Sequence, residues 1–150
     1  MDIAFHSLRQ LAEYAGQHGV VLGLENRYYC CEIPNLDEVE LLLDEFSGTT
    51  GYCHDTGHAE NQARLGFTPH EEWLKHLAPR LVETHLHDIE GIDDHKAPGK
   101  GSLNWDMIAR HLRQDALCVL ELNRYNSVHD IQSGMLLLEQ QGIAGHLQLE

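Results

Sequence analysis

Four residues that can bind a cation recur at near-equal intervals along the chain, each just after a short apolar run. They are Glu25, Asp55, His85 and Glu121, with separations of 30, 30 and 36 residues. A strand plus its helix takes about 30 residues, so the same position recurs in successive units. A carboxylate at the end of a buried strand is costly unless it is paired or bound to a metal. The spacing therefore predicts a metal site built from four strand ends.

Three further residues could join this site. His58 lies three positions after Asp55, and Asp93 and His95 lie in the loop after His85. They could bind an ion or hold a substrate oxygen, or they could be loop residues that face water. His87 is expected to be a structural residue that holds a ligand in place and does not itself bind the ion. The remaining histidines of helices, helix ends and the tail are expected to be solvated: His6, His18, His70, His76, His111, His129 and His146.

Short apolar runs alternate with amphipathic segments along the whole chain. Runs typical of strands cover 20–24, 51–53, 81–84 and 117–120. Helices are expected over 2–17 and 36–46, from Thr68 with Pro69 at its first position, and from Asn104 and Ser127. The apolar stripe of the last helix is expected to include Val128. The order α(βα)4 demands a parallel sheet with helices outside it, in a single domain over residues 1–150.

The charge balance narrows the classes of partner. The formal net charge is −14, from 10 Lys and Arg against 24 Asp and Glu, and the basic residues form no run. Such a surface repels phosphate backbones, so a nucleic-acid partner is not favoured. The sequence shows neither an apolar run long enough to cross a membrane nor the start of a signal peptide. A cytoplasmic protein without membrane contact is therefore expected.

Several segments together resemble one known family. They are 23–29, 54–59, 85–88, 93–95 with 98–101, and 120–123. In this order and spacing they look like the sugar phosphate isomerase/epimerase family, the xylose isomerase-like TIM barrels related to endonuclease IV-type enzymes. The resemblance spans nearly the whole chain, and the set is specific although each piece alone is weak.

The resemblance implies roles for individual residues. Glu25, Asp55, His85 and Glu121 match the ligands of a central divalent metal, and Glu25 and Glu121 also match a pair of acid/base carboxylates. His58 matches a substrate-contacting histidine or a ligand of another metal. Asp93 and His95 match an Asp-x-His pair that completes that additional metal site.

The donor set and the loop after the first ligand extend this interpretation. An oxygen-rich, thiol-free ligand set suits Mn²⁺ or Mg²⁺, with Zn²⁺ or Co²⁺ as alternatives. Asn26 and Arg27 could orient a substrate. Gly91 stands where the family's epimerases often place an arginine, which argues against a ketose 3-epimerase.

The preferred hypothesis is a metal-dependent isomerase or epimerase that acts on a sugar or sugar phosphate through a metal-stabilised enediolate. One alternative is a metal-dependent phosphodiester hydrolase of the endonuclease IV type. A second is a catalytically inactive half-barrel fragment.

The length sets a further expectation, because a complete TIM barrel takes roughly 250 residues. The chain supplies the C-terminal half of such a barrel, preceded by one helix. A half-barrel would expose two strand edges and the inward apolar face of its sheet. Two copies are therefore expected to pair through these edges as a homodimer.

Overall fold

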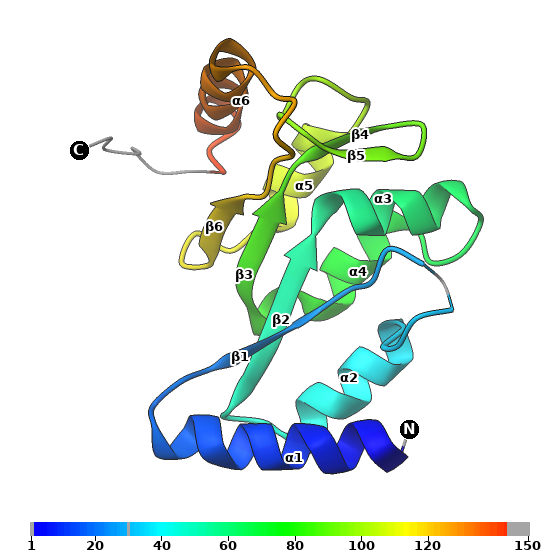
Figure 1. Ribbon diagram of the computed structural model, residues 1–150, viewed down its shortest axis with the longest axis vertical. Helices are drawn as coiled ribbons and strands as arrows, with labels where there is room; N and C mark the ends of the chain where they lie inside the picture. The colour runs from blue at the N-terminus through cyan, green and yellow to red at the C-terminus, as the bar shows by residue number, and fades with distance from the viewer. Residues whose placement is uncertain (1, 30, 144–150) are drawn as a thin grey trace.

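The computed structural model describes residues 2–29 and 31–143 (Figure 1). Strands and helices alternate along most of this length. In chain order they are α1 (Asp2–Gln17), β1 (Leu22–Glu25), α2 (Leu36–Glu45), β2 (Thr50–Asp55), α3 (Thr56–Arg64), α4 (His70–Leu77), a 3₁₀ turn (Ala78–Arg80), β3 (Leu81–Leu86), β4 (Asp88–Glu90), β5 (Asp93–Lys96), α5 (Trp105–His111), β6 (Leu117–Leu120) and α6 (Val128–Gln140).

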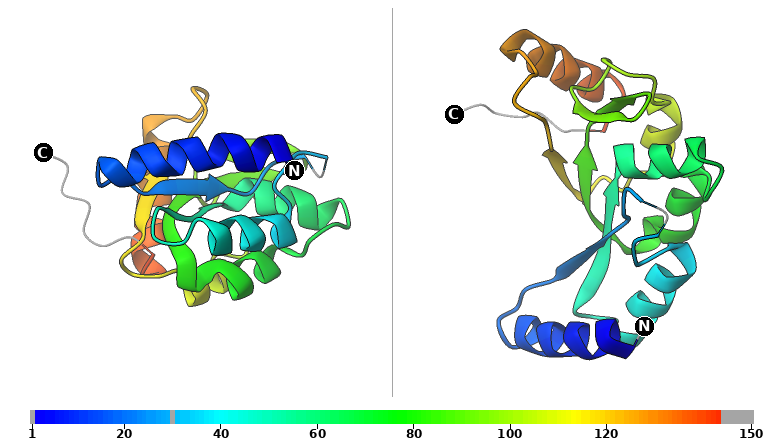
Figure 2. Two further views of the ribbon diagram at one scale, coloured as in Figure 1. Left: turned by 90° about the horizontal axis from the view of Figure 1, so that it is seen from below. Right: turned by 45° about the vertical axis from the view of Figure 1, so that its right-hand side comes forward.

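Four parallel strands form the main sheet, in the order β1-β2-β3-β6. Helices α2, α4 and α5 lie on one face of this sheet, and the described elements leave the opposite face open (Figure 2). All four strands therefore end at the same side of the molecule, as in half of a TIM barrel. The predicted α/β half-barrel is confirmed.

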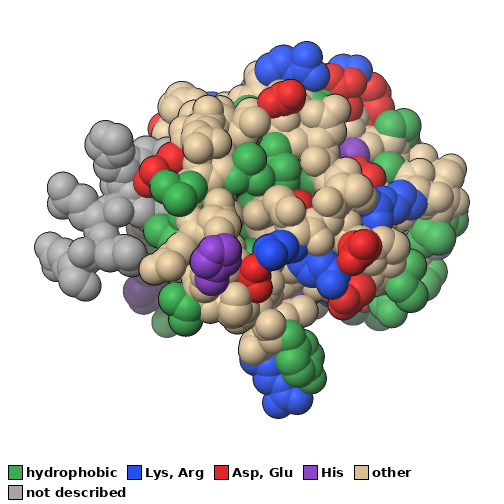
Figure 3. Space-filling view, turned by 90° about the horizontal axis from the view of Figure 1, so that it is seen from above, with side chains coloured by type: hydrophobic (Ala, Val, Ile, Leu, Met, Phe, Trp, Pro, Cys, Tyr) green, Lys and Arg blue, Asp and Glu red, His purple; other side chains and the backbone are tan. Residues whose placement is uncertain are grey.

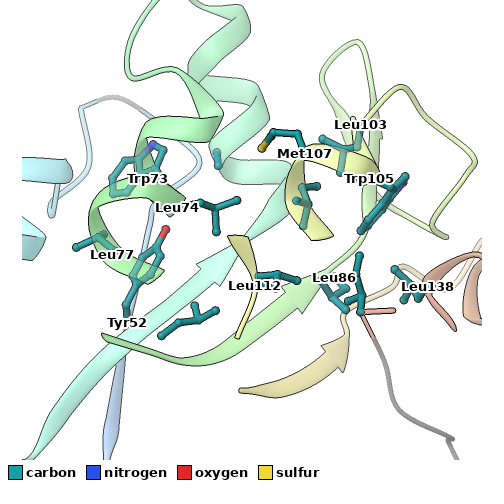
Figure 4. Packing of buried hydrophobic residues seen from close by; sticks show 14 of the residues in the cluster. Tyr52, Trp73, Leu74, Leu77, Leu86, Leu103, Trp105, Met107, Leu112 and Leu138 are labelled. Atoms are coloured by element: carbon teal, nitrogen blue, oxygen red, sulfur yellow. The ribbon is translucent and has the colours of Figure 1, made fainter. Parts of the chain in front are cut away.

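The core lies between the sheet and its helices (Figure 4). Tyr52 of β2 stacks on Trp73 of α4, with ring centroids 6.3 Å apart and planes 9° apart. Successive residues of a strand point to opposite faces, so Tyr52 faces the helices while its neighbours Gly51 and Cys53 face the barrel interior. Each strand thus splits into a core face and an inward face.

Two elements were missing from the sequence prediction. Helix α3 lacks an apolar stripe, and it begins where the side chain of Asp55 accepts a hydrogen bond from the His58 backbone. The β4–β5 hairpin occupies the connection that was expected to be a loop. Helix α4 begins at His70 with Pro69 as its N-cap, so Thr68 is not the cap. Helices α2, α5 and α6 begin where the sequence predicted, with Asn35, Asn104 and Ser127 as their N-caps.

Burial at the ends of the sheet differs from the prediction. Val20 and Val21 precede β1 and are more than half exposed, because β1 is an edge strand with one neighbour. Val128 is 71% exposed, so it does not belong to the apolar stripe of α6. Within the described residues, every helix is too short or too polar to cross a membrane.

The inward face of the sheet is not apolar, contrary to the expectation. The strand register places Glu25, Cys53, Glu83 and Leu117 in one row across the four strands. Only the last of these side chains is aliphatic. This row of the open face is therefore lined largely by groups that can bind ions, whereas Val119, in register with His85, is apolar.

Candidate metal centre

The four predicted strand-end residues lie together. The Nδ1 atom of His85 lies 3.2 Å from Glu25 Oε1, 2.9 Å from Glu121 Oε2 and 3.8 Å from Asp55 Oδ2. One donor atom from each residue lies within 4.8 Å of all the others. Parallel pairing explains the convergence, because the register sets Asp55 of β2 directly beside His85 of β3.

The donors fit a divalent cation. Glu121 Oε2 is shielded from solvent, and its 2.9 Å contact with His85 Nδ1 lacks the geometry of a hydrogen bond, so within the described residues it accepts none. A shielded carboxylate oxygen without a hydrogen bond is costly, and a bound cation would remove that cost. Cys53 and Glu25 raise the pKa of His85 to about 11, although burial opposes this. Three carboxylates that converge on one position attract a divalent cation.

Asp55 is held more firmly than the other carboxylates. Its side chain is fully buried, and both oxygens lie 3.0 Å from Nε2 of the buried His87. The His58 backbone N–H also donates to Oδ1 at 2.8 Å. Burial raises the pKa of Asp55, but the hydrogen bond and charge of His87 outweigh it, so the pKa lies below its ordinary value. The supporting position expected for His87 agrees with these contacts.

A second group of donors lies beside the first, but not as predicted. Asp94, His95 and His58 lie together, whereas the Asp93 side chain is 67% exposed and pairs with Lys96 at 2.6 Å. Strand alternation would put Asp93 on the same side as His95. The left-handed backbone of His95, with φ of 55°, interrupts that alternation. Asp94 therefore takes the position predicted for Asp93, and its Oδ1 lies 2.8 Å from His95 Nδ1.

Comparison with known proteins places this arrangement in a family. The sequence profile of the xylose isomerase-like TIM barrels matches residues 1–141. The chain belongs to this family. The uncharacterized protein MJ1311 of Methanocaldococcus jannaschii is 29% identical over 126 residues, which are 76% of this chain and 40% of that protein.

Solved structures share the fold at low sequence identity. The 3-keto-D-glucoside 4-epimerase YcjR of E. coli matches with a TM-score of 0.69 and 20% identity, over 93% of this chain and 53% of that one. The probable 3-DHS dehydratase AsbF of Bacillus anthracis matches with a TM-score of 0.71 and 19% identity, over 90% of this chain and 55% of that one. An L-ribulose 3-epimerase matches with a TM-score of 0.63 and 17% identity, over 97% of this chain and 47% of that one. The chain thus spans about half of these barrels.

The side chain of Asn26 does not face the candidate metal centre, so its predicted role in substrate binding is wrong. Its side chain is fully buried, and it donates to the Asp55 carbonyl at 2.9 Å. Its Oδ1 accepts from the Asp55 backbone N–H at 2.9 Å and from the Tyr52 hydroxyl at 2.8 Å. Because Asn26 directly follows Glu25, alternation turns it away from the site. Arg27 is part-exposed and lies 3.1 Å from Glu25, so it can still reach a substrate.

Replacing Asn26 with Ala is expected to lower the free energy of unfolding by about 3 kcal/mol, since the change leaves buried donors and acceptors without partners. Urea unfolding followed by circular dichroism measures the loss. Arg27→Ala serves as the control, with an expected loss below about 1 kcal/mol because Arg27 forms part-exposed ion pairs. A loss below 1 kcal/mol in Asn26→Ala would contradict the assigned role.

The hydrogen bonds behind Asn26 continue through the core. Since the Tyr52 hydroxyl donates to Asn26, its oxygen accepts from His54 Nδ1 at 2.8 Å. His54 Nε2 lies 3.1 Å from His70 Nε2, and His70 Nδ1 lies 3.1 Å from Glu60 Oε2. His70 is 5% exposed, so the expectation that it is solvated is wrong.

The Glu60–His70 pair should make stability depend on pH. The hydrogen bond from His70 lowers the pKa of Glu60 from its ordinary 4.5, against burial. A carboxylate whose pKa falls on folding stabilises the fold above its unfolded pKa, and this contribution disappears as pH falls through the folded pKa. We expect Glu60→Gln to cost about 1 kcal/mol at pH 7 and progressively less below pH 4.5.

Urea unfolding at neutral and acidic pH tests this expectation. Glu72→Gln is the matched control, because Glu72 is exposed and its ion pairs with Lys75 and His76 contribute little. A cost of Glu60→Gln that stays constant down to pH 3 would contradict the assigned pair.

Proposed function

We propose that this chain carries the metal and acid/base residues of an enzyme that isomerises or epimerises a sugar or sugar phosphate. One observation carries the proposal. Glu25 and Glu121 come from β1 and the end of β6, at opposite edges of the sheet, yet both lie within 3.2 Å of the same imidazole nitrogen. Two carboxylates that face each other across one position can remove a proton from a carbon and return it on the other side.

Glu25, Asp55, His85 and Glu121 would hold the metal, with Mn²⁺ or Mg²⁺ favoured by the oxygen donors and Zn²⁺ or Co²⁺ as alternatives. When bound, the ion would act as a Lewis acid on the substrate carbonyl. Glu25 takes the proton next to the carbonyl, and Arg27 at 3.1 Å holds that carboxylate in place. Glu121, which must first take a proton from solvent, would deliver it to the enediolate from the opposite side, and Glu25 would then release its proton to solvent. His58, which is part-buried beside both Glu25 and Asp55, is placed to contact a substrate oxygen.

The related structures support this choice, because two of them are named as sugar epimerases. A phosphodiester hydrolase of the endonuclease IV type is the second candidate, and the cluster of His58, Asp94 and His95 favours it by offering another ion site. The charge distribution disfavours it. On the face at which the strands end, Lys and Arg lie next to Asp and Glu, and both Lys96 and Lys100 form ion pairs (Figure 3). A DNA backbone requires a positive track.

Isotope exchange tests the reaction class. The protein, supplied with Mn²⁺ in D₂O and a panel of ketoses, aldoses and their phosphates, should incorporate deuterium from solvent at the carbon next to the carbonyl. Mass spectrometry and proton NMR of the recovered sugar detect the exchange. Conversion without deuterium incorporation, or cleavage of abasic DNA in place of sugar conversion, would contradict the proposal.

We further propose that a second copy completes the barrel. Within the described residues, strands β1 and β6 each have a free edge, and Val20, Val21 and Leu117 are exposed beside them. Two copies related by a two-fold axis along the barrel would pair β1 of each with β6 of the other, giving eight parallel strands. Light scattering should give a mass of twice the 17.0 kDa of one chain, and Leu117→Lys should reduce the mass to that of one chain. A wild-type monomer at tens of micromolar would contradict this pairing.

A further inference from the structure

A second set of metal-binding atoms lies on the inward face, in the same strand row as Glu25 and one row below Asp55 and His85. A donor atom each from Cys53, Glu83 and His85 lies within 4.8 Å of the other two. Cys53 and Glu83 pair in register across β2 and β3. Each precedes a ligand of the upper centre by two positions, so strand alternation turns it to the same face. The mechanism proposed above uses neither Cys53 nor Glu83.

His85 lies between the two sets and presents one ring nitrogen to each. Its Nδ1 faces Glu25 and Glu121, at 3.2 and 2.9 Å. Its Nε2 lies 3.5 Å from Glu83 Oε1, a separation that suits two ligands of one tetrahedral ion. The lower row therefore has its own imidazole donor, directed away from the upper centre.

Burial and a neighbouring glycine define the surroundings of the lower set. Cys53 is 3% exposed, so its sulfur is shielded from bulk solvent. On the adjacent strand stands Gly23, where a Cβ atom would lie 3.2 Å from Cys53 Cβ and 3.8 Å from Glu83 Oε2. A glycine at this position leaves free the space that a side chain would fill.

We propose that Cys53, Glu83 and the Nε2 face of His85 form a second metal site, selective for a thiophilic divalent ion such as Zn²⁺ or Cd²⁺. A thiolate and an imidazole favour these ions, whereas Mn²⁺ and Mg²⁺ prefer oxygen donors. Cys53 releases its proton to solvent when the ion binds, and water takes the fourth position. The two sites of this chain thus differ in the kind of ion that they select.

Sharing His85 makes the two sites compete. A neutral imidazole has one nitrogen with a free electron pair, and the other carries hydrogen. When Nε2 binds an ion, Nδ1 keeps the proton and cannot serve the upper centre. A thiophilic ion in the lower site therefore weakens binding of Mn²⁺ in the upper one. This competition rests on the proposed function, whereas the lower site itself does not.

Absorption spectroscopy tests the lower site without any activity assay. Metal-free protein titrated with Co²⁺ or Cd²⁺ should develop the charge-transfer absorption of a metal-bound thiolate. Cys53→Ser should abolish this band, whereas Cys31→Ser and Cys118→Ser should retain it because these thiols lie outside the cluster. Glu83→Gln should keep the band but weaken Cd²⁺ affinity by about tenfold or more. A wild-type protein without the band, or a band that persists in Cys53→Ser, overturns the proposal.

Electron paramagnetic resonance of Mn²⁺ tests the competition and separates the two proposals. Cd²⁺ should release bound Mn²⁺ from the wild type at a concentration about tenfold or more below the concentration needed for Cys53→Ser, and Mn²⁺ binding by that variant also shows that it folds. Simultaneous binding of both ions to the wild type overturns the competition. Glu25→Gln should retain the thiolate band. A thiolate band in a protein that binds no Mn²⁺ supports the lower site and rejects the upper one.

Discussion

Replacing Glu25 with Gln is expected to lower kcat by a factor of about 10² to 10⁴ or more, while the fold is retained. The amide has the size of the carboxylate but cannot take a proton from carbon, and general-base catalysis contributes a factor of this order. Glu25 ends an edge strand and is part-exposed, so its substitution leaves the core intact. Steady-state kinetics on the sugar identified by the deuterium-exchange screen measures the loss.

Glu32→Gln is the matched control for this experiment. It makes the same chemical change in a carboxylate that shares the partner Arg27, at 3.7 Å, but lies outside the cluster of donors. Its kcat should stay within about twofold of the wild type. Glu121→Gln should resemble Glu25→Gln, because the two carboxylates act in sequence on one carbon. Wild-type turnover in either cluster variant would remove the acid/base assignment.

Removing divalent metal is expected to lower Tm by about 5–10 °C, and Mn²⁺ should restore it. A ligand at about 100 times its Kd adds about 2.7 kcal/mol to the free energy of unfolding. In a chain of this length, each kcal/mol shifts Tm by roughly 2–4 °C. The physical cause is the mutual repulsion of three carboxylates around one imidazole, which a cation relieves. Differential scanning calorimetry with chelator and with added Mn²⁺ measures the shift.

Two aspartates provide the controls for the metal effect. Asp55→Asn should remove the response of Tm to Mn²⁺, because it removes the buried charge at the centre of the cluster. Asp93→Asn should retain the full response, since the Asp93 side chain points to solvent and Lys96. A response that persists in Asp55→Asn, or disappears in Asp93→Asn, would show that the ion binds elsewhere.

The sequence by itself determined the strands, most helices and the convergence of the four strand-end residues. Strand lengths and helix caps are local properties, so the apolar run of β6 and the capping boxes at Asn35 and Ser127 could be recognised from neighbouring residues alone. The recurrence of one ligand per βα unit was equally visible. Parallel strands share one direction, so four strand-end ligands had to meet at one side.

Only the tertiary structure decided which neighbours of these ligands face the site. Asp94 replaces Asp93 because of a single left-handed residue, His95, whose conformation the hairpin fixes. From the sequence, Asn26 was expected in the site and His70 at the surface. Both are buried instead, and both form hydrogen bonds with residues distant along the chain. Whether a polar side chain faces solvent, the core or the barrel interior depends on strand register and on the elements packed against it. Those relations join residues 10 to 60 positions apart, and no local pattern encodes them.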